Sequence, residues 1–573
     1  MRRRGCSTSL SSPPLRCRSS LPPGRDASSG TFGKTFITTP TITAMPWFEA
    51  WGLGWRRGAW GLGAWGLAAV LLTGLPSGCR RPAVIAADTL VLAVEKPPKT
   101  LDPRVGNDAV SARLHQIIFD TLVNKDERLD IVPDLASEFD VSPDARVFTF
   151  RLRPGARFHD GRPLTSADVK YTFETLCAQD FNSPKKGDFA LVEQIEAPDE
   201  RTVVFRCRAP NLPMLGSLVA VGIVPQGTTP DEAAQKPIGT GPFKVVAYRE
   251  NNDIWLEANP DYFKGAPKLK QLRIRFIPDA TTRELELRKG TVQLAINADL
   301  AYSTSQALGK TRGLKLVQAK GTNIAYLGLN CDDPRLADVR VRRALALAID
   351  RETIIRTVFR GMARPAAGPL PPEQWAYPDD LPPPRYDPDE ARRLLAEAGY
   401  GPERPLRLEL KTSAAELPRQ VAAVLQEQLK QVGVALSLRS FEFQTFLQDT
   451  IAGNFQMFYL INVGGNQSVD FLSYFYESSR IPTKEKGYSE GANRGRYRSP
   501  QVDAWLRAAA ATTDKAEQRR LYGLAQKQVV ADAAQIFLWH PHNVAVARES
   551  VQGVELELSG SYAFLRKVWI AAP

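Results

Sequence analysis

Apolar and polar residues alternate at the start of the stretch FTFRLRPGARFHDGRPLTSADVKYTFETL, residues 148–176. Apolar side chains at every second position are typical of a strand with one buried face. A Pro-Gly pair ends that strand, and Asp160-Gly161 predicts a turn because both residue types tolerate a positive φ. Thr165 is followed three residues later by an aspartate, which is the spacing of a capping box. The stretch therefore predicts a strand, a turn and a helix whose first turn contains Ser166.

Three polar residues of this stretch, His159, Asp160 and Ser166, are of the types used in nucleophilic catalysis. A nucleophilic serine needs a base within hydrogen-bond reach and an oxyanion hole, and no Gly-x-Ser-x-Gly elbow is present. His159 lies at the predicted turn and Ser166 at the helix start. We expect these residues to belong to the scaffold and not to a catalytic centre.

The same patterns predict strands and helices in alternation along the rest of the chain. Strands are predicted at 89–94, at 201–208 and on both sides of Asn251-Asn252, and the order strand, helix, strand is predicted within 269–296. No repeat with a period of 20 to 50 residues is present. The chain is therefore predicted to have a mixed α/β fold.

The clearest single helix is predicted in YDPDEARRLLAEAGY, residues 386–400. Asp387 is placed to cap it, Pro388 suits the first helical position and Glu390 completes a capping box. Its apolar positions form one stripe, and Gly399 suits the left-handed terminal position. We interpret the stripe as core.

The stretch ADVRVRRALALAIDRETIIRTVFRG, residues 337–361, alternates arginines with apolar residues at helical spacing. It predicts one or two docked helices. We expect Arg340, Arg342 and Arg343 to form a solvated basic face and not an anion site.

Composition gives the chain an ordinary globular character, with 573 residues of which 43% are hydrophobic and 24% charged. This length accommodates two or three domains. The net charge is +12, but the first 78 residues hold nine basic and two acidic residues, so the remainder carries only +5. Without basic runs interleaved with aromatic residues, a nucleic-acid partner is not expected.

The N-terminal region has the features of an export signal. Residues 1–44 are rich in Ser, Pro, Thr and Arg, and we interpret them as a non-native or disordered extension before a start at Met45. Residues 45–78 carry a basic pair and then an apolar run that ends in small residues, which is typical of a signal peptide. One retained membrane-spanning helix is the alternative. Residues 79–87 are then a tether.

The ending LPSGC of this run resembles a bacterial lipobox, whose cysteine becomes the lipid-modified first residue of the mature chain. Cys79 is therefore the predicted lipidation site, although Pro76 stands where the pattern has an aliphatic residue. A plain secreted protein cut near Ala86-Ala87 is the alternative.

Cysteines and histidines are too few for a disulfide framework or a recognisable metal motif. Among the six cysteines only Cys177, Cys207 and Cys331 lie beyond Cys79, so at most one bridge forms among them. With four histidines and no Cys-x-x-Cys or His-Glu-x-x-His, we expect no metal site and no cofactor. His540 and His542 flank a proline and are a candidate ligand pair, but a loop before a final strand is the favoured interpretation.

Several segments, in order, resemble those of the bacterial extracellular solute-binding proteins of the peptide/nickel type. They are FTFRLRPGARFHDGRPLTSADVKYTFE, PIGTGPFKV, NPDYFKGAPKL, IPDATTRELELRKGTV, DVRVRRALALAIDRETI, YDPDEARRLLAEAGY and the tail from RYRSPQVDAWL onward. The resemblance covers about 90–569. It implies a periplasmic-binding-protein (Venus-flytrap) fold, in which two α/β lobes close by hinge motion and lobe one has an extra subdomain.

The resemblance also implies a function and a domain order. The protein would be the non-enzymatic receptor of an ABC importer, a monomer in the periplasm or at the cell surface, lipid-anchored, that captures a peptide or similar small solute and delivers it to a permease with ATPase subunits. We expect lobe one at 88–320, lobe two at 321–513 and a C-terminal return to lobe one at 514–573.

The ligand loop departs from the pattern of peptide-binding relatives, which place an aspartate in a Trp-x-x-Asp segment before Phe-Leu to pair the free α-amino group. In INVGGNQSVDFLSYFY the gap-free match places Gly464 at that aspartate. We interpret Asp470 as a turn or cap residue, and Asn462, Gly464, Asn466 and Gln467 are the candidate ligand contacts. Blocked peptides, glycans, opine-like conjugates and a metal chelate therefore remain candidate ligands.

Two functions other than import are compatible with the sequence. An anchored sensory protein would bind a solute but serve a signalling partner. A secreted hydrolase would need paired catalytic residues, and the sequence offers only scattered carboxylates.

Overall fold

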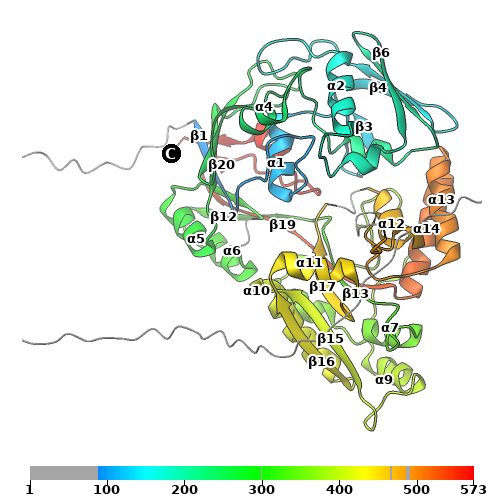
Figure 1. Cartoon of the computed structure of the whole chain (residues 1–573). Helices are drawn as coiled ribbons and strands as arrows, with labels where there is room; N and C mark the ends of the chain where they lie inside the picture. The colour runs from blue at the N-terminus through cyan, green and yellow to red at the C-terminus, as the bar shows by residue number, and fades with distance from the viewer. Residues whose placement is uncertain (1–87, 298–299, 465–467, 486–490, 573) are drawn as a thin grey trace, which may run out of the picture. The chain divides into compact units, whose positions relative to one another are not determined.

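A computed structural model of the chain describes residues 88–297, 300–464, 468–485 and 491–572. Two large mixed β-sheets dominate these residues, and the chain passes between the sheets twice (Figure 1). We call the part built on the first sheet lobe one and the part built on the second sheet lobe two.

Lobe one contains a seven-stranded sheet in the order β12-β19-β11-β1-β10-β9-β8. Its strands are β1 (Thr89–Val94), β8 (Phe243–Arg249), β9 (Asp253–Ala258), β10 (Gln271–Phe276), β11 (Leu294–Ile296), β12 (Leu314–Ala319) and β19 (Asn543–Arg548). Every residue of β1 is buried, because both of its neighbours are parallel strands and apolar residues cover both faces of the sheet.

Several shorter elements complete the body of lobe one. The helices are α1 (Ala109–Ile118), α4 (Pro230–Gln235), α5 (Ala280–Lys289), α6 (Tyr302–Gly309) and the 3-10 helix η4 (Ala563–Lys567). One strand pair is β20 (Val551–Gln552) with β21 (Trp569–Ile570), and the other is β2 (Val123–Lys125) with β3 (Ile131–Pro133). Val123 and Ile131 of the latter pair pack in the core of the subdomain described next.

An antiparallel four-stranded sheet forms a subdomain of lobe one with its own hydrophobic core. In the order β4-β5-β7-β6 its strands are β4 (Ala136–Val141), β5 (Val147–Leu152), β7 (Thr202–Cys207) and β6 (Val192–Asp199). The accompanying helices are α2 (Ser166–Cys177), the 3-10 helix η1 (Lys186–Phe189) and α3 (Met214–Leu218). The predicted strand and helix of this region are confirmed, and Thr165 and Asp168 form the expected capping box.

Lobe two contains a six-stranded sheet in the order β14-β18-β13-β17-β15-β16. Its strands are β13 (Ile324–Leu329), β14 (Ala363–Pro365), β15 (Leu406–Ser413), β16 (Val434–Phe441), β17 (Met457–Asn462) and β18 (Gln535–Pro541). Its helices are α7 (Val339–Leu347), α8 (Arg351–Thr357), α9 (Pro388–Glu397), α10 (Glu416–Lys430), α11 (Phe443–Ala452), α12 (Asp470–Tyr476), the 3-10 helix η3 (Ser478–Arg480), α13 (Pro500–Ala511) and α14 (Lys515–Ala531).

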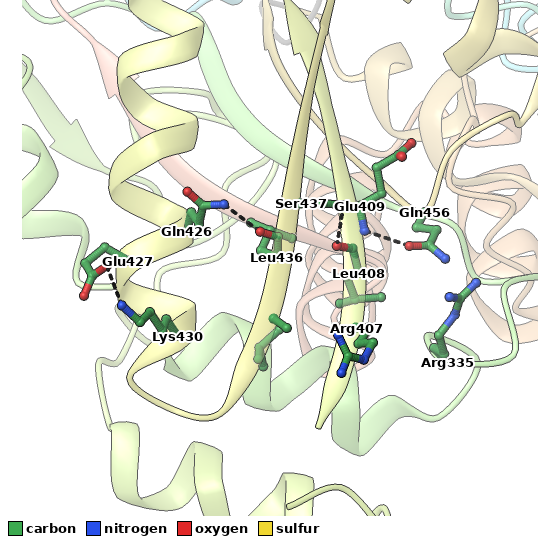
Figure 2. Close-up of a pocket in the computed structure, with 12 residues that line it drawn as sticks. Arg335, Arg407, Leu408, Glu409, Gln426, Glu427, Lys430, Leu436, Ser437 and Gln456 are labelled. Carbon is green, nitrogen blue, oxygen red and sulfur yellow. Dashed lines mark hydrogen bonds and ion pairs between the residues drawn. The ribbon is translucent and has the colours of Figure 1, made fainter. Parts of the chain in front are cut away.

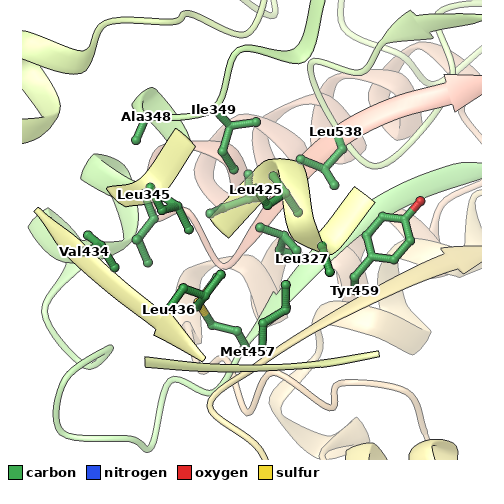
Figure 3. Packing of buried hydrophobic residues seen from close by; sticks show 14 of the residues in the cluster. Leu327, Leu345, Ala348, Ile349, Leu425, Val434, Leu436, Met457, Tyr459 and Leu538 are labelled. Carbon is green, nitrogen blue, oxygen red and sulfur yellow. The ribbon is translucent and has the colours of Figure 1, made fainter. Parts of the chain in front are cut away.

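Both faces of the lobe-two sheet are covered, and β13 shows how. Ala325, Leu327 and Leu329 join the core on the side of α7, α8 and α10, whereas Ile324 and Tyr326 join the core on the side of α12 to α14. This alternation is the two-residue period of a strand. Figure 3 shows the first of these cores, in which side chains from β13, α7, α10, β17 and β18 meet.

The sheet assignment of the C-terminal segment differs from the expected return at 514–573. Helix α14 packs in the core of lobe two, and β18 pairs with β13 and β14 in the six-stranded sheet. Only β19 pairs in the sheet of lobe one. The chain therefore passes between the two sheets at 320–323 and again at 541–543.

Two helix predictions are also refined by the structure. Asp387 accepts a hydrogen bond from the Glu390 amide and Gly399 has a φ of 84°, as expected, but the Glu390 side chain pairs with Arg393 and does not complete a capping box. The basic stretch forms two helices, α7 and α8, because Asp350 caps the second.

The prediction that Arg342 lies on a solvated face was wrong. Its guanidinium is buried and donates to the backbone carbonyls of Leu336, Ala337, Asp532 and Ala533, so it ties α7 to the C-terminal end of α14. Arg340 and Arg343 are exposed, as expected.

Three thiols lie in the described part of the chain, and Cys177, Cys207 and Cys331 are all free. None of the helices in the described ranges combines the length and the apolar character needed to cross a bilayer. The predicted signal, tether and lipidation site at Cys79 lie outside the described residues.

Candidate functional site

The two crossings between the lobes run in direct contact. A Cβ atom added to Gly321 of the first crossing would lie 2.2 Å from the carbonyl oxygen of Pro541, so a glycine is required at this approach. Next to it, the Nδ1 atom of buried His540 lies 3.0 Å from the carbonyl oxygen of Asn323. Residues far apart in sequence therefore form one narrow connection between the lobes.

Asn543 anchors the second crossing on lobe one. Its amide nitrogen donates to the carbonyl oxygens of Glu557 at 2.8 Å and Leu558 at 3.1 Å, and its side-chain oxygen accepts from Asn297 at 3.0 Å. The Asn297 oxygen in turn accepts from the backbone amide of Val544 at 2.8 Å. These bonds hold the start of β19 in place.

A charged group on the lobe-two side borders the first crossing. The two terminal guanidinium nitrogens of Arg364 donate to the carboxylate of Glu373, and the Lys320 ammonium donates to the same carboxylate at 3.3 Å. Burial raises the pKa of Glu373, but the bonds from Arg364 and Lys320 outweigh it and hold that pKa at about 2. Glu373 is therefore ionised and fully engaged by the protein's own cations.

The predicted ligand loop leaves the end of β17 beside the first crossing. Asn462 is half-buried, and Val463 is 55% exposed. Gly464 has a φ of 77°, and its backbone amide donates to the side-chain oxygen of Asn323 at 3.1 Å. At the position where the resemblance places a carboxylate, this chain has no side chain, and the backbone amide is already bound to Asn323. Asn466 and Gln467 lie outside the described residues.

Asp470, the first residue of α12, is the carboxylate that follows this loop. Its Oδ2 atom accepts a hydrogen bond from the Ser468 hydroxyl at 2.7 Å. Burial raises the pKa of Asp470 to about 6, although the bond from Ser468 and the charge of Lys125 oppose that shift. Asp470 thus takes part in an electrostatic interaction with lobe one, beyond the turn or cap role expected from the sequence.

The two lobes approach each other closely at this carboxylate. A Cβ atom added to Gly216 in α3 would lie 2.6 Å from the Ser468 hydroxyl oxygen and 2.8 Å from Asp470 Oδ2. Real Cβ contacts are longer than this, so the absence of a side chain at Gly216 permits the approach.

Lys125, the last residue of β2 in lobe one, carries the cation that acts on Asp470. Burial lowers the pKa of Lys125 to about 8, and the Asp470 charge partly counteracts the shift. No pattern in the sequence indicates Lys125, because a lysine at the end of a three-residue strand has no local signature of function.

Two further pairs of opposite charge connect the lobes on the same side. Asp188 in η1 interacts electrostatically with Arg480 in η3, and Asp130 between β2 and β3 forms an ion pair with Lys515 at the start of α14. Complementary charges therefore face each other where the lobes meet.

The triad-like residues of the first lobe lie in its four-stranded subdomain and have structural partners. His159 Nε2 lies 3.0 Å from the Gly241 carbonyl oxygen, and the Gly239 amide donates to His159 Nδ1 at 3.3 Å. The Ser166 hydroxyl donates to the Asp199 carbonyl oxygen. Asp160 forms an ion pair with Arg162 at 2.8 Å. Each contact stabilises a turn or a helix start.

The residues that the structure describes contain no group of three or more His, Cys, Asp and Glu side chains that could hold a metal ion. His540 and His542 lie on either side of Pro541, at the second crossing, and both have a lowered pKa because of burial and of the positive charge of Arg364. The two histidines therefore lie in the segment that connects the two large sheets, which indicates a structural role.

A cavity of about 690 Å³ lies elsewhere in lobe two, between α10 and the first halves of β15 and β16 (Figure 2). Its acidic side chains are already paired, Glu427 with Lys430 at 3.6 Å and Glu409 with Arg439 at 3.1 Å. Ligands of α/β sheets bind at the carboxyl ends of parallel strands, and this cavity lies at the amino ends. The loop after β17 is therefore the better candidate site.

The model of the bacterial extracellular solute-binding proteins, family 5, middle region, matches residues 130–483 of the chain. The chain is 29% identical over 515 residues to a di/tripeptide-binding protein 2 of Pseudomonas aeruginosa, covering 83% of this chain and 94% of that protein. It is 31% identical over 469 residues to a glutathione-binding protein GsiB of Pectobacterium atrosepticum, covering 79% and 89% of the two chains.

Solved structures agree with these matches. The periplasmic binding protein DppA of Helicobacter pylori, in complex with the peptide STSA, has a TM-score of 0.70 and 26% identity, with 84% of this chain and 98% of that chain covered. The binding protein AgaA of A. tumefaciens R10, in complex with agropinic acid, has a TM-score of 0.69 and 25% identity, with 85% and 99% covered.

These matches select among the functions that the sequence leaves open. The family consists of non-enzymatic transport receptors that act outside the cytoplasm, so the secreted hydrolase is not supported. The chain belongs to the bacterial extracellular solute-binding proteins of family 5, the substrate-binding proteins of ABC transporters for peptides and related solutes.

Proposed function

We propose that this receptor binds a peptide-like solute beside the loop that follows β17 and does not require a free α-amino group in that solute. The observation that carries the proposal is Gly464, whose backbone amide points to Asn323 at 3.1 Å where a ligand-binding carboxylate is expected. In this proposal Asn462, Gly464, Asn466 and Gln467 contact the ligand through neutral polar groups.

Two carboxylates near the meeting of the lobes support the proposal because each already has a cation of the protein as its ion-pair partner. Glu373 is paired with Arg364 and Asp130 with Lys515, while Asp470 interacts electrostatically with Lys125. A buried ammonium without a partner carboxylate loses its hydration without compensation. The loss of one charge-assisted hydrogen bond weakens binding by about 1.5 to 3 kcal/mol.

The relatives support the proposal because proteins of the same fold are named for, or were solved with, different ligands. The proteins compared above are named for di/tripeptides and glutathione or were solved with the peptide STSA and with agropinic acid. Solutes with a blocked or substituted amino end, such as acylated peptides and opine-like conjugates, fit a loop that offers amides in place of a carboxylate.

A matched pair of ligands tests the proposal. Isothermal titration calorimetry with trialanine and with N-acetyl-trialanine compares solutes that differ in the charge at the amino end. The acetylated peptide is expected to bind at least as well as the free peptide. If acetylation weakens binding tenfold or more, about 1.4 kcal/mol, a carboxylate of the protein holds the ammonium and the proposal is wrong.

The receptor is also proposed to act as a monomer anchored to the membrane by lipid at Cys79. The lipobox-like ending LPSGC before the mature chain supports the anchor. Labelled palmitate is expected to be incorporated into the wild-type chain and not into the Cys79→Ala variant. Incorporation that persists in the variant would contradict the lipid anchor.

A further inference from the structure

A direct ion pair joins the hairpin of β2 and β3 in lobe one to the start of α14 in lobe two. The Lys515 ammonium binds the Asp130 carboxylate, although the two residues are 385 positions apart in the sequence. The Asp130 side chain is 23% exposed and that of Lys515 is 59% exposed, so water reaches the pair. Each of the two partners is held in place by contacts within its own lobe.

Asp130 follows a turn of fixed shape. The Asp126 side chain accepts hydrogen bonds from the backbone amides of Arg128 at 2.8 Å and Asp130 at 2.9 Å, and the Asp126 amide donates to the Asp130 carbonyl oxygen at 3.0 Å. Leu129, at the tip of the hairpin, is buried and has a φ of 61°. A residue other than glycine keeps such a backbone angle only where its surroundings fix it. The hairpin therefore holds the Asp130 carboxylate in a set position.

Lys515 is held on lobe two by an aromatic side chain. Its ammonium lies 5.0 Å from the centre of the Trp375 ring, and that ring packs edge-on against Tyr522 of α14, with 6.1 Å between the ring centres. The acidic residues nearest in sequence have other partners, because Asp514 accepts bonds from backbone amides as the cap of α14 and Glu517 forms an ion pair one turn further along. A cation in the first turn of a helix is unfavourable unless an anion compensates it. The anion that Lys515 binds comes from lobe one.

We propose that Asp130 and Lys515 form a latch, an ion pair that exists only while the lobes are together and that stabilises the closed form with any solute. Both halves of the latch are positioned before they meet, so closure loses little conformational entropy at this contact. The inference goes beyond the proposed function, because the latch acts on closure and not on the charge at one end of the solute.

Chemical coupling tests whether the latch forms and whether it belongs to the closed form. A carbodiimide activates a carboxylate, and a neighbouring amine then forms an amide with it while the carbodiimide takes up the water lost and leaves as a urea. In the ligand-free wild type, peptide mass spectrometry is expected to find Asp130 joined to Lys515. It is also expected to find Asp380 joined to Lys527, whose ion pair at 2.5 Å lies within lobe two.

The coupled wild type is expected to have a smaller radius of gyration than the Lys515→Gln variant after the same treatment. Equal radii would overturn the latch, as would a wild type in which only the link between Asp380 and Lys527 forms. This result is independent of which solute the receptor binds.

Calorimetry measures what the latch contributes to binding. Asp130→Asn and Lys515→Gln are each expected to weaken the binding of both trialanine and N-acetyl-trialanine about two- to fivefold, as for an ion pair that water reaches. The double variant is expected to bind no more weakly than either single variant, because both changes remove the same interaction. Exchanging the charges, with Asp130→Lys and Lys515→Asp together, is expected to restore the affinity to within about 1.5-fold of wild type.

Lys527→Gln is the matched control, because it removes a paired lysine from the same helix without affecting a contact to lobe one. Its affinities are expected to stay within about 1.5-fold of wild type. The ratio of the two affinities is expected to be that of wild type in every variant, so a preference for the free peptide overturns the proposed function and leaves the latch in place. Additive losses in the double variant, or unchanged affinities in both single variants, overturn the latch.

Discussion

At the scale of single residues, several polar side chains serve the fold through bonds to distant backbone groups. His159 bridges Gly239 and Gly241, and buried Arg342 binds carbonyl groups at two helix ends. Such bonds satisfy backbone groups that would otherwise be buried without partners. A polar residue in a motif-like stretch is therefore not by itself evidence of a site.

His159 yields a prediction on the pH dependence of stability. Burial lowers the pKa of His159 to about 4, and its Nδ1 already accepts a bond from the Gly239 amide, so the folded protein holds the ring neutral. The unfolded chain has the ordinary value of about 6.5. The free energy of unfolding that the neutral His159 ring contributes is constant above pH 6.5. It is lost as the pH falls toward 4, by about 1.4 kcal/mol per pH unit.

Urea unfolding at pH 7, 6 and 5 checks this prediction against the His159→Gln variant. The variant is expected to lose stability less steeply on acidification, because its unfolding takes up about one proton fewer than that of the wild type. Its ligand affinity is expected to stay within about threefold of wild type. Equal slopes for the two proteins would contradict the assigned proton state. A hundredfold loss of affinity in a folded variant would contradict the scaffold role.

At the scale of elements, the contact between α3 and the start of α12 limits how closely the lobes approach. The short helix α3 presents Gly216 to Ser468 and Asp470, and the missing Cβ leaves just enough room. Gly187 in η1, also in lobe one, has no atoms within 4 Å of its added Cβ. A bulky side chain introduced at Gly216 therefore meets lobe two, whereas the same side chain at Gly187 serves as a control.

Gly216→Leu is expected to weaken ligand binding at least tenfold, because the larger side chain opposes closure while leucine is well tolerated in a helix. Small-angle scattering of the wild type should give a smaller radius of gyration with bound ligand, and the variant should show less of this change. Gly187→Leu is expected to behave as wild type. An unchanged wild-type profile at saturation would contradict closure, and full affinity in Gly216→Leu would contradict the role of this contact.

At the scale of the whole molecule, the chain assembles two separately packed sheets that are connected by two adjacent crossings. Each lobe has cores on both faces of its sheet, so motion between the lobes leaves these cores intact. The crossings are fixed to the sheets by bonds from Asn543 and His540. This arrangement suits a hinge, in which few residues absorb the change in backbone angles.

Local patterns in the sequence determined much of this fold. The alternation before Pro154, the capping box at Thr165 and the cap at Asp387 depend on neighbours within a few residues, and the structure has each of them. The ordered segments were sufficient to indicate the family, which the comparisons confirm. They also indicated Gly464 as the departure in the ligand loop.

Only the tertiary structure decided which groups meet across the chain. The burial of Arg342, the assignment of α14 and β18 to lobe two, and the electrostatic interaction between Lys125 and Asp470 each involve residues separated by well over a hundred positions. Periodicity reports whether a side chain is buried but not what buries it, since that partner is set by sheet order and helix packing. The charge of the candidate site is for this reason a property of the assembled lobes and not of any one segment.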